Sequence, residues 1–566
     1  MQCSYNLTER DKIKGGFFMN SLLLLLLTIG IFLVAYITYG AYVAKKFGID
    51  PTRKTPAHTL RDDIDYCPAN SKVLLGHHFS SIAGAGPISG PIQAAIFGWV
   101  PVFLWVIVGS IFIGGVHDFG SLVASVRHDG KSIGEVIKVN IGDRGKKLFN
   151  IFGFLTIILV VAAFADICAS TFSYDPGAPE KLMGAQAGTA SMLFIVLAVV
   201  FGTCVYRKGA KLSVSSIIGV LALIFCIYIG YKFPICKFSK LTWQIILLVY
   251  IFFASTLPVW LLLQPRDYLC SFLLYGIIIG AVLGIIIKHP TLQIPAFSGF
   301  TVGGKTLFPF LFVTVACGAI SGFHSLVSSS TTSKQIDKEA PDAKFIGYGA
   351  MLIEGVVAII ALIAVGYVAK AEGTPAGIFA NGVASFMSGF KVPVEIGVVF
   401  VTLCFSAFAL TSLDTATRIG RYILQELCEG KDGRKNIVSK NMYIATGITV
   451  LLSFGLILFG YNKIWPIFGS ANQLLAALAL LAITAWLTKS GKKTLFTIIP
   501  MIFMFIVTLS ALGLLIKDYL FVANRNYVLG IIAIVLFILA IVLIVEAYTT
   551  LVGKKKNQSI KRNRSV

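Results

Sequence analysis

Apolar runs long enough to cross a membrane occupy most of this 566-residue chain, and they restrict it to a helical membrane protein. A helix rises about 1.5 Å per residue, so about 20 apolar residues span the hydrocarbon of a bilayer. Charged residues make up only 13% of the chain, whereas soluble domains carry about 25%. The sequence therefore predicts an all-α polytopic protein of about fifteen transmembrane helices, at residues 19–43, 77–97, 99–126, 147–172, 185–206, 212–231, 242–263, 268–288, 306–333, 345–369, 393–417, 441–461, 464–488, 494–516 and 527–550.

The distribution of basic residues predicts how these helices are oriented. Cytoplasmic segments of membrane proteins are enriched in Lys and Arg, and anionic lipid attracts basic tails to that side. With the N-terminus outside, 34 of the 48 Lys and Arg residues fall in inside segments or at their edges, and 14 fall outside. We therefore expect an external N-terminus and a cytoplasmic C-terminus.

The run from His77 to Phe97 contains residues that interrupt helices, namely Gly84, Gly86, Pro87, Gly90 and Pro91. Proline removes a backbone donor and clashes with the preceding turn, and glycine weakens the helix further. Irregular backbone at membrane depth persists only where it is buried in protein or lines a wet cavity. The run is interpreted either as a kinked core helix or as a discontinuous helix whose freed N–H and C=O groups bind a solute.

A second interruption is expected between Thr256 and Tyr268, where Pro258 and Pro265 lie seven residues apart. Paired interruptions in two halves of a chain are typical of transporters built from inverted repeats. Each half would hold five helices, with discontinuous first and sixth core helices. The expected organisation is an extra helix and cytoplasmic link at 1–76, an inverted-repeat transport core at 77–425 with halves 77–231 and 242–425, additional helices at 426–550, and a basic cytoplasmic tail at 551–566.

Hydroxyl and ionisable side chains within the apolar runs are candidates for ion coupling. Hydroxyls of the ninth run can back-bond to their own helix, or they can complete a cation or proton site with carbonyls freed in the first interruption. Ionisable groups cost about 2.5–3.5 kcal/mol each at membrane depth, which makes them functional candidates. Asp414 has Arg418 four residues later, which favours a helical ion pair, whereas Glu354 has no basic neighbour within one turn. The candidates for ion coupling are Ala83, His117, Asp118, Ser328, Ser329, Thr331, Thr332, Glu354 and Asp414.

Several motifs resemble the carbon-starvation protein A (CstA) family, and the resemblance covers roughly residues 20–550. The motifs lie at 76–87, 118–119, 263–268, 322–326, 412–418 and 469–476. Family members resemble carriers of the amino-acid/polyamine/organocation (APC) superfamily and are described as starvation-induced importers of peptides or, in some members, of pyruvate with protons. The resemblance implies a secondary active transporter in a prokaryotic inner membrane. This chain carries His117 where many relatives have Gln, and Ser80 and Ser81 where they have Ala.

Residues and resemblance together predict an importer of small carboxylate-bearing nutrients, peptides or pyruvate, with H⁺ favoured over Na⁺ as the coupling ion. No enzymatic activity, cofactor, metal or nucleic-acid partner is expected. A sodium-coupled amino-acid carrier is the alternative. An intramembrane metalloenzyme is disfavoured because adjacent histidines point about 100° apart on a helix and the chain has no HExxH motif. The expected substrate-binding residues are His77, His78, Ser81, Gly84, Ala85, Gly86, Pro87, Gly90, Gln264, Arg266 and Asp267.

Overall fold

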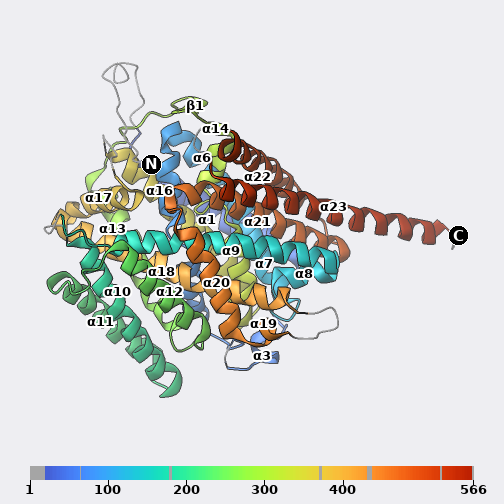
Figure 1. Ribbon diagram of the computed structural model, residues 1–566, viewed down its shortest axis with the longest axis horizontal. Helices are drawn as coiled ribbons and strands as arrows, with labels where there is room; N and C mark the ends of the chain where they lie inside the picture. The colour runs from blue at the N-terminus through green and yellow to red at the C-terminus, as the bar shows by residue number, and fades with distance from the viewer. Residues whose placement is uncertain are drawn as a thin grey trace.

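The computed structural model describes residues 19–563 apart from 64, 178–181, 369–372, 430–435 and 523–524. Within this part of the chain, the protein is a bundle of helices with one short strand pairing, between β1 (Thr301–Val302) and β2 (Lys305–Thr306) (Figure 1). Eleven helical segments are long and apolar enough to cross a membrane. The apolar composition of the runs therefore gives the mostly helical, multi-pass architecture that the sequence predicts.

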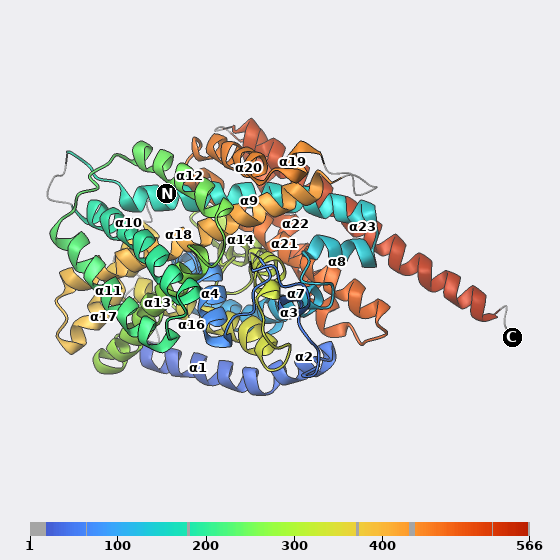
Figure 2. The ribbon, with the colours of Figure 1, turned by 90° about the horizontal axis from the view of Figure 1, so that it is seen from below.

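Two of the long segments combine neighbouring helices, and a third extends past the bundle. α1 (Ser21–Ile37) continues into α2 (Tyr39–Phe47), α6 (Trp99–Gly109) continues through a π turn into α7 (Gly115–Val126), and α23 (Tyr527–Asn563) projects from the bundle towards the C-terminus (Figures 1 and 2). The side chains of the basic tail at 551–566 lie outside the described residues. The other long helices are α9 (Asp143–Phe172), α10 (Met183–Gly202), α11 (Leu212–Lys232), α13 (Leu263–Lys288), α16 (Gly349–Tyr367), α18 (Val394–Leu427), α21 (Tyr461–Lys489) and α22 (Leu495–Phe521).

Shorter helices complete the bundle. Two are apolar but brief, α12 (Lys240–Thr256) and α20 (Met442–Ile457). The remaining short helices connect or flank the spans: α3 (Pro56–Thr59), α8 (Ile133–Asn140), α17 (Pro375–Met387) and α19 (Ile437–Lys440). Two further expected spans consist of half-helices, so the number fifteen stays a prediction.

The expected interruption of the 77–97 run is present. α4 (Ser71–Ile82) is followed by three residues that belong to neither helix, and α5 (Gly86–Ala94) then begins with Pro87 in its first turn. Proline is tolerated there because the first amides of a helix have no intrahelical acceptor. We call residues 83–85 the first interruption.

The second interrupted helix is not where the sequence analysis placed it. Residues 257–262 connect α12 to α13, which are separate helices, and Pro265 lies in the first turn of α13. The second discontinuous span is instead the ninth run, which divides into α14 (Leu307–Thr314) and α15 (Gly322–Ser330). We call residues 315–321 the second interruption.

Two long helices lie at the centre of the bundle. α9 and α18 run side by side along the bundle, and both are buried over most of their length (Figure 2). α21 is buried along its whole apolar stretch, whereas α11 lies at the periphery and exposes Ile217, Leu221 and Phe225. Apolar side chains on such an outer face suit contact with lipid.

Candidate functional site

The two interruptions pack directly against each other inside the bundle. A Cβ added at Gly86 would lie 2.3 Å from both Cβ and Sγ of Cys317. Gly318 has a φ of +51°, and a Cβ there would lie 3.2 Å from Pro87 Cα. Glycine permits both the positive φ and the close backbone approach. The irregular backbone of each half-helix pair is therefore buried in protein, as its depth requires.

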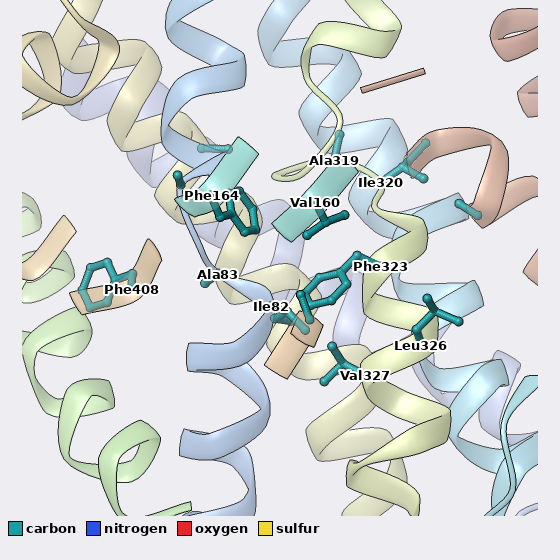
Figure 3. Close-up of a cluster of buried hydrophobic side chains, with 14 of the residues drawn as sticks. Ile82, Ala83, Val160, Phe164, Ala319, Ile320, Phe323, Leu326, Val327 and Phe408 are labelled. Atoms are coloured by element: carbon teal, nitrogen blue, oxygen red, sulfur yellow. The ribbon is translucent and has the colours of Figure 1, made fainter. Parts of the chain in front are cut away.

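Side chains of neighbouring helices fill the remaining space around the first interruption. A Cβ at Gly84 would lie 2.4 Å from Ser412 Oγ and 3.6 Å from Phe164 Cζ. Figure 3 shows Phe164 of α9 and Phe323 of α15 in the apolar cluster that also holds Ala83. The structure brings together five of the expected substrate residues, Gly84, Ala85, Gly86, Pro87 and Gly90. In this conformation side chains of neighbouring helices cover the first interruption.

Replacing Gly86 with alanine should destabilise the protein by about 1–3 kcal/mol, because the new methyl group overlaps the Cys317 side chain. The double variant Gly86→Ala/Cys317→Gly should recover most of the loss, since it removes the overlapping atoms. Gly513→Ala is the matched control, because a Cβ there meets nothing within 4 Å. Thermal unfolding of the purified variants measures all three, and equal destabilisation of the single and double variants would contradict this packing.

Asp267 of α13 joins the expected substrate residues of α4. Its Oδ2 lies 2.8 Å from His77 Nδ1 and accepts a hydrogen bond from Ser81 Oγ at 3.2 Å. Its backbone carbonyl accepts a hydrogen bond from Ser80 Oγ at 3.0 Å. All these side chains are buried. Gln264, one turn earlier, is also buried, and its Nε2 has no hydrogen-bond partner among the described residues.

Hydroxyl groups of α18 satisfy the end of α4. Thr411 and Ser412 donate hydrogen bonds to the carbonyls of Ser80 and Ser81, at 3.1 and 3.0 Å. The last carbonyls of a helix have no intrahelical donor, and a buried one is costly unless it is paired. α18 therefore stabilises the first interruption from outside α4.

Arg266 forms an ion pair with Asp414 of α18. Tyr250 of α12 donates a hydrogen bond to Asp414 Oδ2 at 2.6 Å and accepts one from Arg266 Nη1 at 2.5 Å. The expected pairing of Asp414 with Arg418 is wrong, because Arg418 instead donates to the carbonyl of Leu257, at the end of α12. Free carbonyls at a helix end attract cations, which explains the change of partner.

Four buried ionisable side chains of α7, α15 and α16 lie within ion-pair distance of one another in a row, and the central contact, between His324 and Asp118, is also a hydrogen bond. His117 Nδ1 lies 2.8 Å from Asp118 Oδ1, and Asp118 Oδ2 lies 3.0 Å from His324 Nδ1. His324 Nε2 lies 3.3 Å from Glu354 Oε2. Glu354 Oε1 accepts a hydrogen bond from the Gly318 amide at 3.2 Å, so the chain ends on the second interruption. We call His117, Asp118, His324 and Glu354 the ionisable chain.

The ionisable chain suits proton transfer. Imidazole gains and loses protons near neutral pH and can donate from one ring nitrogen while it accepts at the other. Buried ionisable groups at membrane depth typically mark ion pathways. Across the described ranges, no three or more His, Cys, Asp or Glu side chains are arranged as ligands of a metal ion. His324 of α15 occupies the centre of the chain.

The hydroxyl groups at the end of α15 have different surroundings. Thr332 Oγ1 lies 2.8 Å from His78 Nδ1, which holds the ninth run against α4. Ser329 back-bonds to the Leu326 carbonyl at 3.5 Å, while the buried hydroxyls of Ser328 and Thr331 have no partner among the described residues. Within the same part of the chain, these hydroxyls make no hydrogen bond to the carbonyls of residues 83–86. The expected cation site with Ala83 therefore stays a prediction.

Two amide side chains of α21 were not among the sequence candidates. Asn472 Oδ1 accepts a hydrogen bond from the Phe323 amide at 2.8 Å, and its Nδ2 donates to Ser321 Oγ at 3.0 Å. Gln473 Nε2 donates to the carbonyls of Phe312 and Val315, at 2.5 and 3.3 Å. Both residues stabilise the second interruption. Adjacent amides in a long apolar helix were the signal that could have identified them.

Charged and aromatic residues close one side of the bundle, which we call the α3 face because it carries α3 and the loops beside it. Asp65 Oδ1 lies 3.7 Å from Arg418 Nη1 and accepts a hydrogen bond from Tyr422 OH at 2.5 Å. Burial alone would raise the pKa of Asp65, but the charges of Lys334 and Arg418 and the Tyr422 hydrogen bond lower it. The segment before α4 is thereby held to the end of α18.

Asp65→Asn should destabilise the protein by about 1–2 kcal/mol at neutral pH, because it removes a charge-assisted hydrogen bond. Since the folded pKa is lowered, this contribution is present above the ordinary aspartate pKa of about 3.9 and is lost as the pH falls through the lowered value. Thermal unfolding measured across pH should show that the variant and the wild type become equally stable only at acid pH. Asp63→Asn, at an exposed position of the same loop, is the control. A difference that is already absent at pH 7 would contradict the pairing.

Comparisons with known proteins give the family. The model of the family described as Carbon starvation protein CstA matches residues 20–374 and 367–511. This chain belongs to the CstA family. It is 33% identical to the pyruvate/proton symporter BtsT of Escherichia coli over 89% of this chain and 82% of that protein. It is 34% identical to the peptide transporter CstA of the same organism, over 88% of this chain and 82% of that protein. It is 30% identical to the peptide transporter CstA of Bacillus subtilis, over 97% and 100%.

Solved structures are more distant from this CstA family member. A manganese transporter from Eremococcus coleocola is 12% identical with a TM-score of 0.49, over 87% of this chain and 99% of that one. MhsT in complex with L-phenylalanine is 13% identical with a TM-score of 0.48, over 84% and 99%.

Proposed function

We propose that this CstA family member is a proton-coupled importer of small carboxylate-bearing nutrients, peptides or pyruvate, and not an enzyme. The observation that carries the proposal is the ionisable chain, which ends on the second interruption. A proton on this chain changes the charge next to the backbone that a solute would contact. The printed names of the relatives, a pyruvate/proton symporter and peptide transporters, support the same class of solute and ion.

The two interruptions are the proposed solute site. The half-helices α5 and α15 begin there, and helix N-termini favour anionic groups such as a carboxylate. Because the interruptions now touch each other and Ser412, a solute can enter only if they separate. The remaining expected substrate residues lie on α4 and in the first two turns of α13, namely His77, His78, Ser81, Gln264, Arg266 and Asp267. We assign them to the surroundings of the site, with Asp267 and Arg266 holding α4 and α18 in place.

The placement of the interruptions favours a revised division of the inverted repeats. Each half would begin with an interrupted span, and the third span of each half would be one of the long buried helices α9 and α18. α10 and α11 would then form an inserted hairpin. The proposed halves are α4–α5, α6–α7, α9, α12 and α13, followed by α14–α15, α16, α18, α20 and α21. Alternating access would move the two interrupted spans relative to α9 and α18.

Sodium coupling is the second candidate, and the unpartnered hydroxyls of Ser328 and Thr331 favour it. Hard cations prefer oxygen ligands such as hydroxyls and carbonyls. Uptake of radiolabelled pyruvate and of a labelled dipeptide into proteoliposomes separates the candidates, with pH and sodium gradients imposed one at a time. The proposal predicts accumulation driven by the pH gradient alone. Accumulation that requires sodium would favour the alternative, and no uptake of either solute would overturn the proposed function.

A further inference from the structure

A polar cavity of about 300 Å³ lies at the α3 face, beyond the end of α15. Its lining comes from five segments of the chain: the loop before α4, the residues just before α8, the 330–334 turn, the end of α18 and α19. Two basic and two acidic side chains line it, Lys131, Lys334, Glu426 and Glu429, together with Tyr66, Ser132, Ser330 and Tyr422. Thr332, two residues from Ser330, lies 2.8 Å from His78 Nδ1, so the turn that lines the cavity also contacts α4.

Lys334 supplies a cation to this cavity without an oxygen partner. Its Nζ lies 4.5 Å from the ring centroid of Tyr422 and 5.2 Å from that of Tyr66. Among the described residues, no oxygen lies within hydrogen-bond distance of this nitrogen and no carboxylate lies within 4 Å of it. An ammonium group carries three N–H donors, so aromatic faces leave its hydrogen-bonding capacity unused.

Ser330 supplies a second unused donor. It is 3% exposed, and its hydroxyl has no hydrogen-bond partner among the described residues. A buried polar group without a partner costs free energy, which a ligand with an acceptor oxygen would recover. Lys334 and Ser330 therefore line the same cavity with donors that lack acceptors.

Asp65 and Glu426, whose charges act on Lys334, make their hydrogen bonds to other residues. Asp65 accepts a hydrogen bond from Tyr422 OH at 2.5 Å and lies 3.7 Å from Arg418. Glu426 accepts a hydrogen bond from Ser132 Oγ at 2.8 Å. Burial lowers the pKa of Lys334, but the fields of Tyr422, Asp65, Tyr66 and Glu426 outweigh this and raise it, so the side chain stays an ammonium ion at neutral pH.

We propose that this cavity binds the carboxylate of a small solute, with Lys334 Nζ and Ser330 Oγ as its donors. A carboxylate offers acceptors to both groups and neutralises the cation. The site is separate from the one between the two interruptions. The proposed transport function enters this proposal only in the identity of the solute. That solute would be either a transported nutrient leaving the protein or another monocarboxylate of the cytosol.

Equilibrium dialysis with labelled pyruvate, on the purified full-length chain, tests the proposal. Lys334→Gln should bind one pyruvate fewer per chain than the wild type, because loss of the charge weakens this site by about tenfold or more. Ser330→Ala should weaken the same site by less. Lys338→Gln is the matched control, since Lys338 is an exposed lysine of the same loop outside the cavity lining. Methyl pyruvate, which lacks the carboxylate, should not compete.

Wild-type binding by a folded Lys334→Gln variant, or competition by methyl pyruvate for the Lys334-dependent site, would overturn the proposal. Displacement of that pyruvate by acetate would identify a general monocarboxylate site, whereas resistance to acetate would identify a site for the transported solute. The measurement needs no uptake. If proteoliposomes fail to accumulate pyruvate while Lys334-dependent binding persists, the proposed function falls and the cavity site stands.

Discussion

Arg266→Ala should lose most of its folded yield, because it would leave Asp414 as an uncompensated buried charge. Arg266 is 2% exposed and Asp414 is fully buried. Removing one partner of a buried ion pair costs about 3–5 kcal/mol, a large part of the stability of a domain. Size-exclusion profiles and thermal unfolding of the solubilised variant measure the loss.

A matched triple variant replaces Arg266, Asp414 and Tyr250 together. Arg266→Met/Asp414→Leu/Tyr250→Phe removes the charges and the hydroxyl of this ion pair together, so it should recover most of the folded yield. Arg266→Lys tests the remaining substrate role, because it keeps the charge but loses the planar fork that suits a carboxylate. A loss of transport larger than the loss of folded protein would indicate that Arg266 contacts solute. A triple variant as unstable as Arg266→Ala would contradict the account of the ion pair.

Glu354→Gln should reduce uptake driven by a pH gradient to the level of protein-free vesicles, while solute binding and folding persist. Glutamine keeps the shape of the side chain and an acceptor for the Gly318 amide, but it cannot take up or release a proton. Uptake and counterflow in the same proteoliposomes separate coupling from binding. Glu546→Gln, in α23 and away from the ionisable chain, is the control. Normal gradient-driven uptake by Glu354→Gln would exclude this carboxylate from the proton path.

The first interruption could be predicted from sequence because its cause is local. Glycines and prolines concentrated in one apolar run weaken a helix whatever packs around it. The prolines at 258 and 265 misled the prediction of the second, because Pro265 lies in the first turn of α13, where its missing N–H removes no intrahelical hydrogen bond. The second interruption contains no proline, and the local signal for it was the pair Gly318 and Gly322, four residues apart.

The candidate site was predictable as a set of residues but not as an arrangement. His117, Asp118 and Glu354 stand out because ionisable groups are costly in apolar runs. Their connection depends on His324, which reaches Asp118 and Glu354 from another helix, and sequence spacing carries no information on that contact. The same limit explains the wrong partner predicted for Asp414. Its nearest basic residue in sequence does not pair with it, whereas Arg266, 148 positions away, does.

In the proposed mechanism, solute and proton enter together and the ionisable chain carries the proton. Proteoliposomes containing a pH-sensitive dye test it directly, with pyruvate or a dipeptide added outside in the absence of any imposed gradient. The account predicts solute-dependent acidification of the lumen with the wild-type chain and none with Glu354→Gln, both measured against protein-free vesicles. Entry of the labelled solute without acidification, or equal acidification by Glu354→Gln, would contradict it.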